Sequence, residues 1–348
     1  MRKGGAVRRR TSEGASRWRL LLPVLALAFL LVACSGGDDL PQDALDPQGP
    51  YAEKVHNLAK PVFIVAGLVF VLVQGLVIYA ALRFRRRSED EAPVQVHGNV
   101  RLELTWTVIP AAVLAVVGVL VVGALVDLDR TPKGDDVVNV RVIGHQWWWE
   151  YEYPDHDVVT ANELHIPVGV PIAVSLDSVD VIHSFWPPKL AGKLDAIPGR
   201  TNHLTLEAEE PGTYFGQCAE FCGLSHADMR LRVVAHEPAE FDQWVEDNAK
   251  PAELPTESEA AAGAALFRAK GCASCHAIDG FAAGVVGPDL THLQQREVFA
   301  GAIFDLNEKN LRAWLRDPPA EKPGSLMPNL ELTEEEITSL IAYLDTLK

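Results

Sequence analysis

The segment CAEFCGLSHADM holds the side chains with the strongest chemical signature in the chain. It places Cys218 and Cys222 four residues apart, ahead of His226 and Met229. Thiolate, thioether and imidazole groups together favour copper over magnesium, calcium or manganese. A single cysteine with histidine and methionine would suit a mononuclear blue-copper site, whereas a second thiolate supplies enough sulfur to bridge two copper ions. With His183, from VIHSFWPP, as a further ligand, the sequence predicts a dinuclear copper centre for electron transfer.

Two other uses of paired cysteines stay open at this point. Outside the cytoplasm, two cysteines can form a structural disulfide. A Cys-x-x-x-Cys pattern also suits a redox or metal-delivery protein. Neither alternative requires a histidine and a methionine at these offsets.

A second chemical motif, GCASCH, lies near the C-terminus. Cys-x-x-Cys-His is the attachment signature of c-type haem, with Cys272 and Cys275 as thioether links and His276 as the proximal ligand. A zinc site would need two more ligands nearby, and His292 alone is insufficient. Met327, in GSLMPNL, is the only methionine after the motif, and it is the predicted sixth ligand. Methionine opposite histidine raises the haem potential.

The residues between 131 and 249 have the pattern of an all-β domain. Short runs rich in β-branched and aromatic residues alternate in polarity, and proline and glycine separate them. We expect a Greek-key sandwich or barrel, with strands at 137–143, 147–153, 170–176, 202–207 and 229–235 and a helix at 238–248. In the run GHQWWWEYEY, alternation implies that at least one of Trp147, Trp148 and Trp149 faces outward.

A linker rich in Pro and Glu is predicted at 250–258, before a domain at 259–348. Helices expected at 258–269, 308–316 and 333–347 give a small all-α class I cytochrome c domain. The last of them follows Thr333, a helix N-cap residue succeeded by acidic residues.

The N-terminus reads as an export signal. Residues 1–33 are basic, then apolar, and end in LVA before Cys34, which resembles a bacterial lipobox. We expect a cleaved signal peptide and a lipid-anchored Cys34. An uncleaved first membrane helix is the alternative, although the apolar run is short for a span.

Residues 34–130 contain two runs that are apolar and long enough to cross a bilayer, at 61–82 and 104–126. The basic connector between them, RFRRR, belongs in the cytoplasm by the positive-inside rule. We therefore expect a transmembrane hairpin in a bacterial plasma membrane, with the C-terminal domains extracytoplasmic.

The net charge of the chain limits the kinds of macromolecule that it can bind. The formal charge of the chain is −16, and because the first 33 residues carry seven Lys/Arg and one Glu, their removal makes it −22. A chain this acidic is a poor nucleic-acid binder and a good docking surface for a basic protein. All five cysteines have a chemical role above, so no structural disulfide is required.

The copper segment with its upstream HSFWPP resembles cytochrome c oxidase subunit II, and the appended cytochrome resembles the caa type of that family. The resemblance implies a cupredoxin-like fold and a CuA centre. Its copper ligands would be His183, Cys218, Cys222, His226, Met229 and the carbonyl of Glu220. It also implies that the Glu220 side chain reaches a magnesium or manganese ion shared with subunit I.

Three further residues acquire a role only through this resemblance. Electrons would enter the copper domain at Trp147, in a stretch where the family usually has tyrosine at the position of Trp148. Asp195, in KLDAIPGR, would belong to an acidic patch that docks a cytochrome. Glu103, in RLELTWTVIP, would lie near the mouth of a proton pathway, or would simply be an interfacial charge.

The implied function is an electron relay. Electrons from a cytochrome c, or from an upstream quinol–cytochrome c reductase, would pass through haem c and CuA to haem a of subunit I. Oxygen is reduced to water there, coupled to proton translocation. Other oxidase subunits and membrane lipid are the remaining partners, and tethering the haem raises its effective concentration so that docking need not be tight.

Four other classes of protein share part of this sequence pattern. Nitrous oxide reductase resembles the chain at the copper loop only and needs a histidine-rich propeller. A membrane-anchored copper-delivery protein usually has one span and a thioredoxin-like pattern. A quinol-oxidase subunit II lacks the copper cysteines. A stand-alone shuttle is disfavoured only by Glu103 and Glu220.

Overall fold

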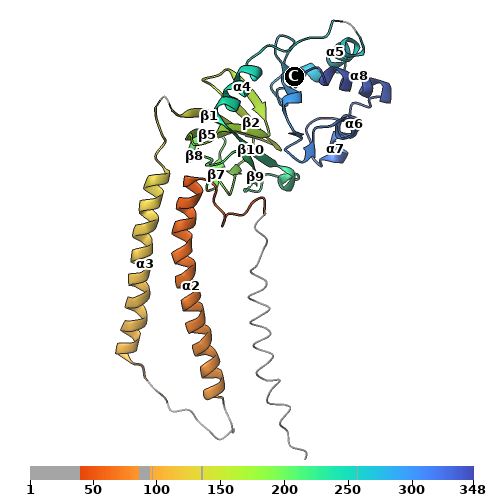
Figure 1. The fold of residues 1–348 in the computed structure, drawn as a ribbon. Coiled ribbons are helices and arrows are strands. Elements are labelled where there is room, and N and C mark those ends of the chain that lie inside the picture. Colours follow the sequence, from red (N-terminus) through yellow and green to blue (C-terminus); the bar gives the residue numbers. More distant parts are fainter. Residues whose placement is uncertain (1–39, 86–94, 96, 135, 257) are drawn as a thin grey trace, which may run out of the picture. The chain divides into compact units, whose positions relative to one another are not determined.

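The computed structural model describes residues 40–85, 95, 97–134, 136–256 and 258–348 (Figure 1). Residues 42–348 form one compact unit. The predicted signal segment 1–33 and the predicted lipid-anchor residue Cys34 lie outside the described residues. So do Arg86 and Arg87 of the basic connector.

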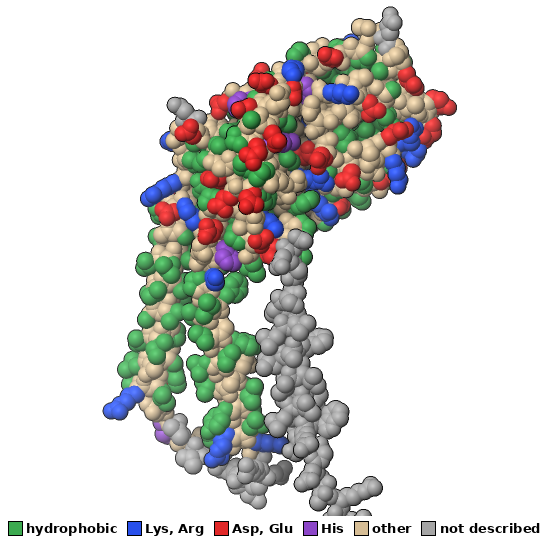
Figure 2. Space-filling model, viewed as in Figure 1, with side chains coloured by type: hydrophobic (Ala, Val, Ile, Leu, Met, Phe, Trp, Pro, Cys, Tyr) green, Lys and Arg blue, Asp and Glu red, His purple; other side chains and the backbone are tan. Residues whose placement is uncertain are grey.

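Two long apolar helices form the N-terminal part of this unit. Helix α2 spans Pro50–Arg83 and helix α3 spans Val100–Leu128, with mean hydropathies of 2.6 and 2.8 over their most apolar windows. Hydrophobic side chains cover the visible face of both helices (Figure 2). The predicted spans 61–82 and 104–126 lie inside them. Helix α2 begins earlier than its span because Pro50 suits the first helical turn, where no backbone N–H is required.

The first turns of α2 are attached to the β domain that follows. The amide of Ala52 donates to the carbonyl of Leu190 at 3.2 Å, and the amide of Gln48 donates to that of Lys189 at 2.7 Å. The Lys189 ammonium also pairs with Asp46 at 2.8 Å. These contacts link the membrane hairpin to the copper-binding domain through backbone bonds, independently of the connection after α3.

Residues 138–236 form two five-stranded sheets. One sheet has the order β3-β2-β1-β5-β8 and the other has the order β4-β10-β9-β6-β7. Strand β1 pairs with β5 in parallel, as β10 does with β4, and the other neighbours are antiparallel. The strands are β1 Val138–His145, β2 Trp148–Tyr153, β3 Val158–Ala161, β4 Glu163–Pro167, β5 Ile172–Ser178, β6 His183–Trp186, β7 Leu194–Ala196, β8 Asn202–Leu206, β9 Gly212–Cys218 and β10 Arg230–His236.

The core of this domain confirms the predicted cupredoxin-like sandwich. Trp149, Tyr151 and Phe185 are fully buried and meet edge to face, with ring centroids 5.4 Å apart for Trp149 and Phe185. Helix α4, Pro238–Asn248, closes the domain where the sequence placed a helix, and its Trp244 packs on Tyr153. Sequence patterning located five strands but not β3, β4, β6, β7 and β9. Most of these are short or lack clear alternation.

The C-terminal domain has the predicted helices and two short hairpins in addition. Helix α5 is Glu259–Ala269, α6 is Glu308–Arg316, α7 is Pro318–Glu321 and α8 is Glu334–Leu344. Thr333 and Glu336 form a capping box that starts α8. The hairpins and single turns are β11 Ala277–Ile278 with β12 Ala282–Ala283, β13 Val298–Phe299 with β14 Phe304–Asp305, and the 3₁₀ turns η2 Cys272–Ser274 and η3 Leu293–Gln295.

Helices α5 and α8 approach closely at Gly263. A Cβ atom added to Gly263 would lie 1.9 Å from the carbonyl oxygen of Ser339 in α8. We predict that Gly263→Ala destabilises the haem domain by about 1–3 kcal/mol, because the helices must separate. Thermal unfolding followed at the haem absorbance measures this, with the exposed Ala262→Ser on the same helix as control. Equal melting of the two variants would contradict the packing described.

Candidate functional site

The predicted copper ligands come from two neighbouring strands and the loop after one of them. His183 is the first residue of β6, and Cys218 is the last residue of β9, where it pairs with Phe185. The amide of Cys218 donates to the carbonyl of Met229 at 2.8 Å, which closes the loop before β10 begins. Strand pairing thus brings His183 to a cysteine 35 positions later.

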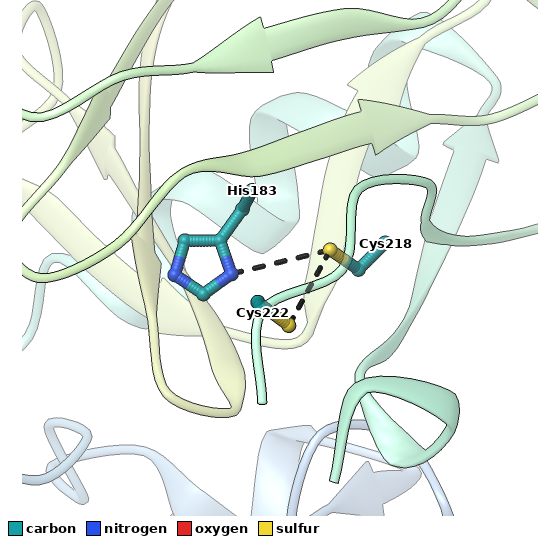
Figure 3. A group of neighbouring side chains, drawn as sticks. All are labelled: His183, Cys218 and Cys222. Atoms are coloured by element: carbon teal, nitrogen blue, oxygen red, sulfur yellow. Dashed lines mark hydrogen bonds between the residues drawn. The ribbon is translucent and has the colours of Figure 1, made fainter. Parts of the chain in front are cut away.

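Three of the predicted ligands point their donor atoms toward one another (Figure 3). The donor atoms of His183, Cys218 and Cys222 all lie within 4.8 Å of one another, and all three residues are buried. The two Sγ atoms are 3.8 Å apart, and His183 Nδ1 lies 3.9 Å from Cys218 Sγ. A disulfide has an S–S length of about 2.05 Å. The two cysteines are therefore free thiols in this structure.

The other three predicted donors surround the same pair of sulfur atoms. His226, in the 3₁₀ turn η1 (His226–Asp228), places Nδ1 3.6 Å from Cys222 Sγ. The sulfur of Met229 lies 3.9 Å from Cys222 Sγ, and the carbonyl oxygen of Glu220 lies 3.2 Å from Cys218 Sγ.

This donor set fits a pair of copper ions. Two thiolates, two imidazoles, a thioether and one carbonyl form a predominantly soft set of the kind that copper favours. The structure brings together all six donors that the sequence proposed. Their bonds to metal stay a prediction.

The pKa values of the two thiols shift in opposite directions. Hydrogen bonds from the Cys222 thiol and from His183 lower the pKa of Cys218 to about 3, although burial opposes this shift. The pKa of Cys222 is raised, because this thiol holds the proton that the pair shares and is itself buried. Cys218 is therefore the thiol of the pair that ionises more readily, and the thiolate is the form that binds metal.

Asp180 orients His183, and sequence analysis did not identify it. Its Oδ1 lies 2.7 Å from His183 Nε2, so Nδ1 is left facing the sulfurs. The same carboxylate accepts the amides of Gln146 and Val181, each at 2.6 Å. Burial lowers the pKa of His183, but the hydrogen bonds to Asp180 and Cys218 outweigh this and raise it overall. A carboxylate behind a ligating histidine is a common device for fixing ring orientation. Its sequence signal is an aspartate three positions before the histidine.

All three tryptophans are buried, with exposed fractions of 7%, 9% and 0% for Trp147, Trp148 and Trp149. Trp147 and Trp149 belong to the hydrophobic core of the domain and Trp148 does not, which agrees with the alternation expected along the strand. Trp148 stacks on His145 with ring centroids 4.0 Å apart. Trp147 Nε1 donates to the carbonyl of Cys222 at 3.0 Å, which places its indole directly against the copper loop.

The haem motif sits in the 3₁₀ turn η2 and the residues after it. Gly271 has a φ of 83° and begins the turn, and the amide of His276 donates to the carbonyl of Cys272 at 3.0 Å. His276 Nδ1 lies 2.8 Å from the carbonyl of Pro288, which leaves Nε2 free to bind iron. Burial lowers the pKa of His276 and so favours the neutral imidazole that a ligand must be.

Met327 lies in the loop between α7 and α8. It is partly buried against the core of the haem domain, and Trp314 Nε1 lies 3.2 Å from its sulfur. Two large apolar side chains in these segments are exposed. Val285 is 83% exposed and precedes Val286, whose amide donates to the carbonyl of Cys275, and Leu326 is 69% exposed and precedes Met327. Exposed apolar surface beside the motif is what a covalently held porphyrin would cover. The residues present therefore fit haem c.

The remaining predicted residues lie outside the two ligand clusters. The Glu220 side chain is exposed on the copper loop. Glu103 is in the first turn of α3, where it accepts the amide of Asn99 at 3.2 Å. Asp195 lies in β7, opposite Ser184 of β6, with its side chain 41% exposed.

The fold and the two clusters define a class of protein: a membrane-anchored electron-transfer protein with a cupredoxin-like domain and a cytochrome domain. Family models agree with each part. The model described as the transmembrane domain of cytochrome c oxidase subunit II matches residues 42–122. The model of its periplasmic domain matches 157–236, and the cytochrome c model matches 260–348. The chain belongs to the cytochrome c oxidase subunit II family.

Relatives resemble the chain over nearly its whole length. Cytochrome c oxidase subunit 2 of Alkalihalophilus pseudofirmus is 41% identical over 94% of this chain and 96% of the relative. That of Bacillus subtilis is 35% identical over 95% and 98%. The crystal structure of the periplasmic domain of subunit II from Bradyrhizobium japonicum is 36% identical over 34% of this chain and 96% of that chain, with a TM-score of 0.33. The chain is thus part of a haem–copper oxidase, an oxidoreductase with subunit I and other subunits as partners.

Asp180 allows a test of the copper cluster. We predict that Asp180→Asn weakens copper binding by about 10–100-fold, because the histidine loses the carboxylate that orients its ring. Copper titration followed by electron paramagnetic resonance measures the change. The exposed Asp242→Asn in α4 is the control. Wild-type affinity in Asp180→Asn would show that the ring is held by packing alone.

Proposed function

We propose that this chain is the electron-accepting subunit of a caa-type cytochrome c oxidase. It would receive electrons from a cytochrome c, or from an upstream quinol–cytochrome c reductase, and pass them by way of haem c and CuA to haem a of subunit I. Oxygen reduction to water there is coupled to proton translocation. The observation that carries this proposal is the cluster of six soft-site donors in a chain that also has a haem-attachment motif.

When bound, the copper pair and the haem would each supply reversible one-electron chemistry. The chain's residues hold these groups rigidly and keep water away. His183, Cys218 and Met229 are buried, and the pairing of β6 with β9 places the first two close together. A preformed and buried ligand set resists rearrangement, which favours fast electron transfer.

On the haem side, Cys272 and Cys275 would attach the porphyrin, and His276 and Met327 would bind its iron. Support for His276 comes from its bond to Pro288, which fixes the ring. Trp147 would pass electrons to the copper cluster, because its indole is hydrogen-bonded to the carbonyl of a predicted copper ligand, Cys222.

Four further roles rest on sequence resemblance. The exposed Glu220 side chain would reach a magnesium or manganese ion shared with subunit I. Asp195 would contribute to cytochrome docking, and Glu103 would serve the proton pathway. Cys34 would carry the lipid anchor in a bacterial plasma membrane, with the two C-terminal domains outside the cytoplasm. The two membrane helices and the match to a periplasmic family domain support this topology.

The copper assignment is tested by Cys222→Ser. A serine oxygen is too hard a donor to replace a bridging thiolate, so we expect the two-copper hyperfine pattern in electron paramagnetic resonance to disappear. Cys275→Ser is the matched control: it should keep that pattern while weakening covalent haem retention in denaturing gels. A two-copper spectrum in Cys222→Ser would contradict the ligand assignment.

The haem assignment is tested by Met327→Leu. The two thioether bonds should keep the haem attached, while loss of the methionine sulfur should lower its reduction potential. A spectroelectrochemical titration of the purified oxidase measures this, with the copper spectrum as an internal control. If the potential does not move, another residue is the sixth ligand.

A further inference from the structure

Lys322 is a buried lysine at the contact between the haem domain and the copper domain. Only 3% of it is exposed. Its Nζ donates to the carbonyl of Trp147 in the copper domain at 2.6 Å and to that of Ala300 in its own domain at 2.7 Å. Lysines are almost never fully buried without partners, because removing an ammonium from water is costly. One of its two hydrogen-bond acceptors belongs to the copper domain, so separating the domains would remove that bond.

The loop that begins at Lys322 covers the tryptophan beside the copper cluster. A Cβ added to Gly324 would lie 2.7 Å from Trp147 Cη2, so only a glycine lets the backbone come this close. Ser225 of the copper loop donates a hydrogen bond to the carbonyl of Pro323. The same loop continues to Met327, the predicted haem ligand. No room is left for another protein on Trp147.

A second contact lies along the edge formed by β4 and β10. Glu163 is 1% exposed, and its carboxylate accepts the amides of Glu297 at 3.0 Å and Val298 at 2.9 Å, at the start of β13. The amide of Arg230 donates to the carbonyl of Gly301 at 2.9 Å. These bonds pair buried polar groups of one domain with groups of the other.

A third group of bonds involves arginine side chains and reaches β3 as well as β10. Arg296 Nε, which is buried, lies 3.2 Å from Thr160 Oγ1. Arg232 pairs with Glu297 at 3.1 Å. Opening this contact would leave Glu163, Arg296 and Lys322 without their partners in the other domain.

We propose that Lys322 and Glu163 are positioning residues that lock the haem domain onto the copper domain, so that Trp147 is reserved for this chain's own haem. This inference rests on the proposed function. A soluble donor then delivers electrons to the haem domain and not to Trp147 directly. The two domains are held together by specific hydrogen bonds between buried groups as well as by the linker.

The direct test cuts the tether in the assembled oxidase. A protease site inserted between Leu254 and Thr256 leaves untouched the Lys250 carbonyl that His292 contacts. After cleavage, the wild-type haem domain should co-elute with the oxidase in size-exclusion chromatography. In Lys322→Met and in Glu163→Gln it should dissociate at least tenfold more readily. The first variant leaves the buried carbonyls of Trp147 and Ala300 without their donor, and the second removes one of the two carboxylate oxygens that accept the amides of Glu297 and Val298. The exposed Lys309→Met is the matched control.

Dissociation of the cleaved wild-type domain as readily as of the variants would overturn the proposal. Because Lys322→Met could disturb folding, Glu163→Gln provides an independent variant of nearly unchanged shape. Haem and copper contents, measured before cleavage, separate this outcome from failure of the proposed function. If haem and copper are both present and the cleaved domain still leaves freely, only the proposed role of Lys322 and Glu163 is refuted. If copper is missing, the proposed function is refuted.

A stopped-flow experiment with the uncut oxidase tests the proposal independently, through the order in which haem c and copper are reduced. Reduced soluble cytochrome c is mixed with it, and haem c and copper absorbances are followed by stopped flow. In the wild type, copper should be reduced only after haem c. Lys322→Met and Glu163→Gln should slow the second phase at least tenfold, with the haem potential and copper spectrum unchanged. Copper reduction ahead of haem c in the wild type would contradict a reserved Trp147.

Discussion

The separation of two sulfur atoms is the constraint on which this structure depends. To share metal ions as proposed, Cys218 and Cys222 would have to lie close together without bonding to each other, and their Sγ atoms lie 3.8 Å apart. The β-sandwich meets this requirement by anchoring Cys218 in a strand and closing the loop through the bond between the Cys218 amide and the Met229 carbonyl. The other donors then have little freedom left to lose, so the ligand set is preorganised.

Rigidity extends outward from this cluster in two directions. Asp180 holds His183 while also binding the backbone of the segment that leads to Trp147. Trp147 in turn contacts the copper loop through its indole and the haem domain through its carbonyl. Trp147 thus contacts both the copper loop and the haem domain, and the close backbone approach at Gly324 is possible because that residue has no side chain. The two domains share an interface and are not joined by the linker alone.

The membrane hairpin is joined to this unit by more than a chain connection. Helix α2 continues beyond its apolar span to Pro50, and its start is hydrogen-bonded to residues that follow β6. The strand that carries His183 is therefore connected through a few residues to the membrane helix. Such a connection restrains the position of the strand that carries His183 relative to the start of α2.

Much of this architecture is readable from local sequence, because hydropathy, alternation and ligand spacing are properties of neighbouring residues. The apolar spans, the helices at 238–248 and 308–316, and both cofactor motifs belong to this group. Asp180 was missed because its position three residues before His183 does not by itself indicate that the two side chains meet. The burial of Trp147 and Lys322 could not be predicted from local sequence, because it depends on a contact between residues 175 positions apart. The sequence by itself determined which chemical groups are present and in what order. Only the tertiary structure decided which of them are desolvated together, because burial depends on contacts between distant segments.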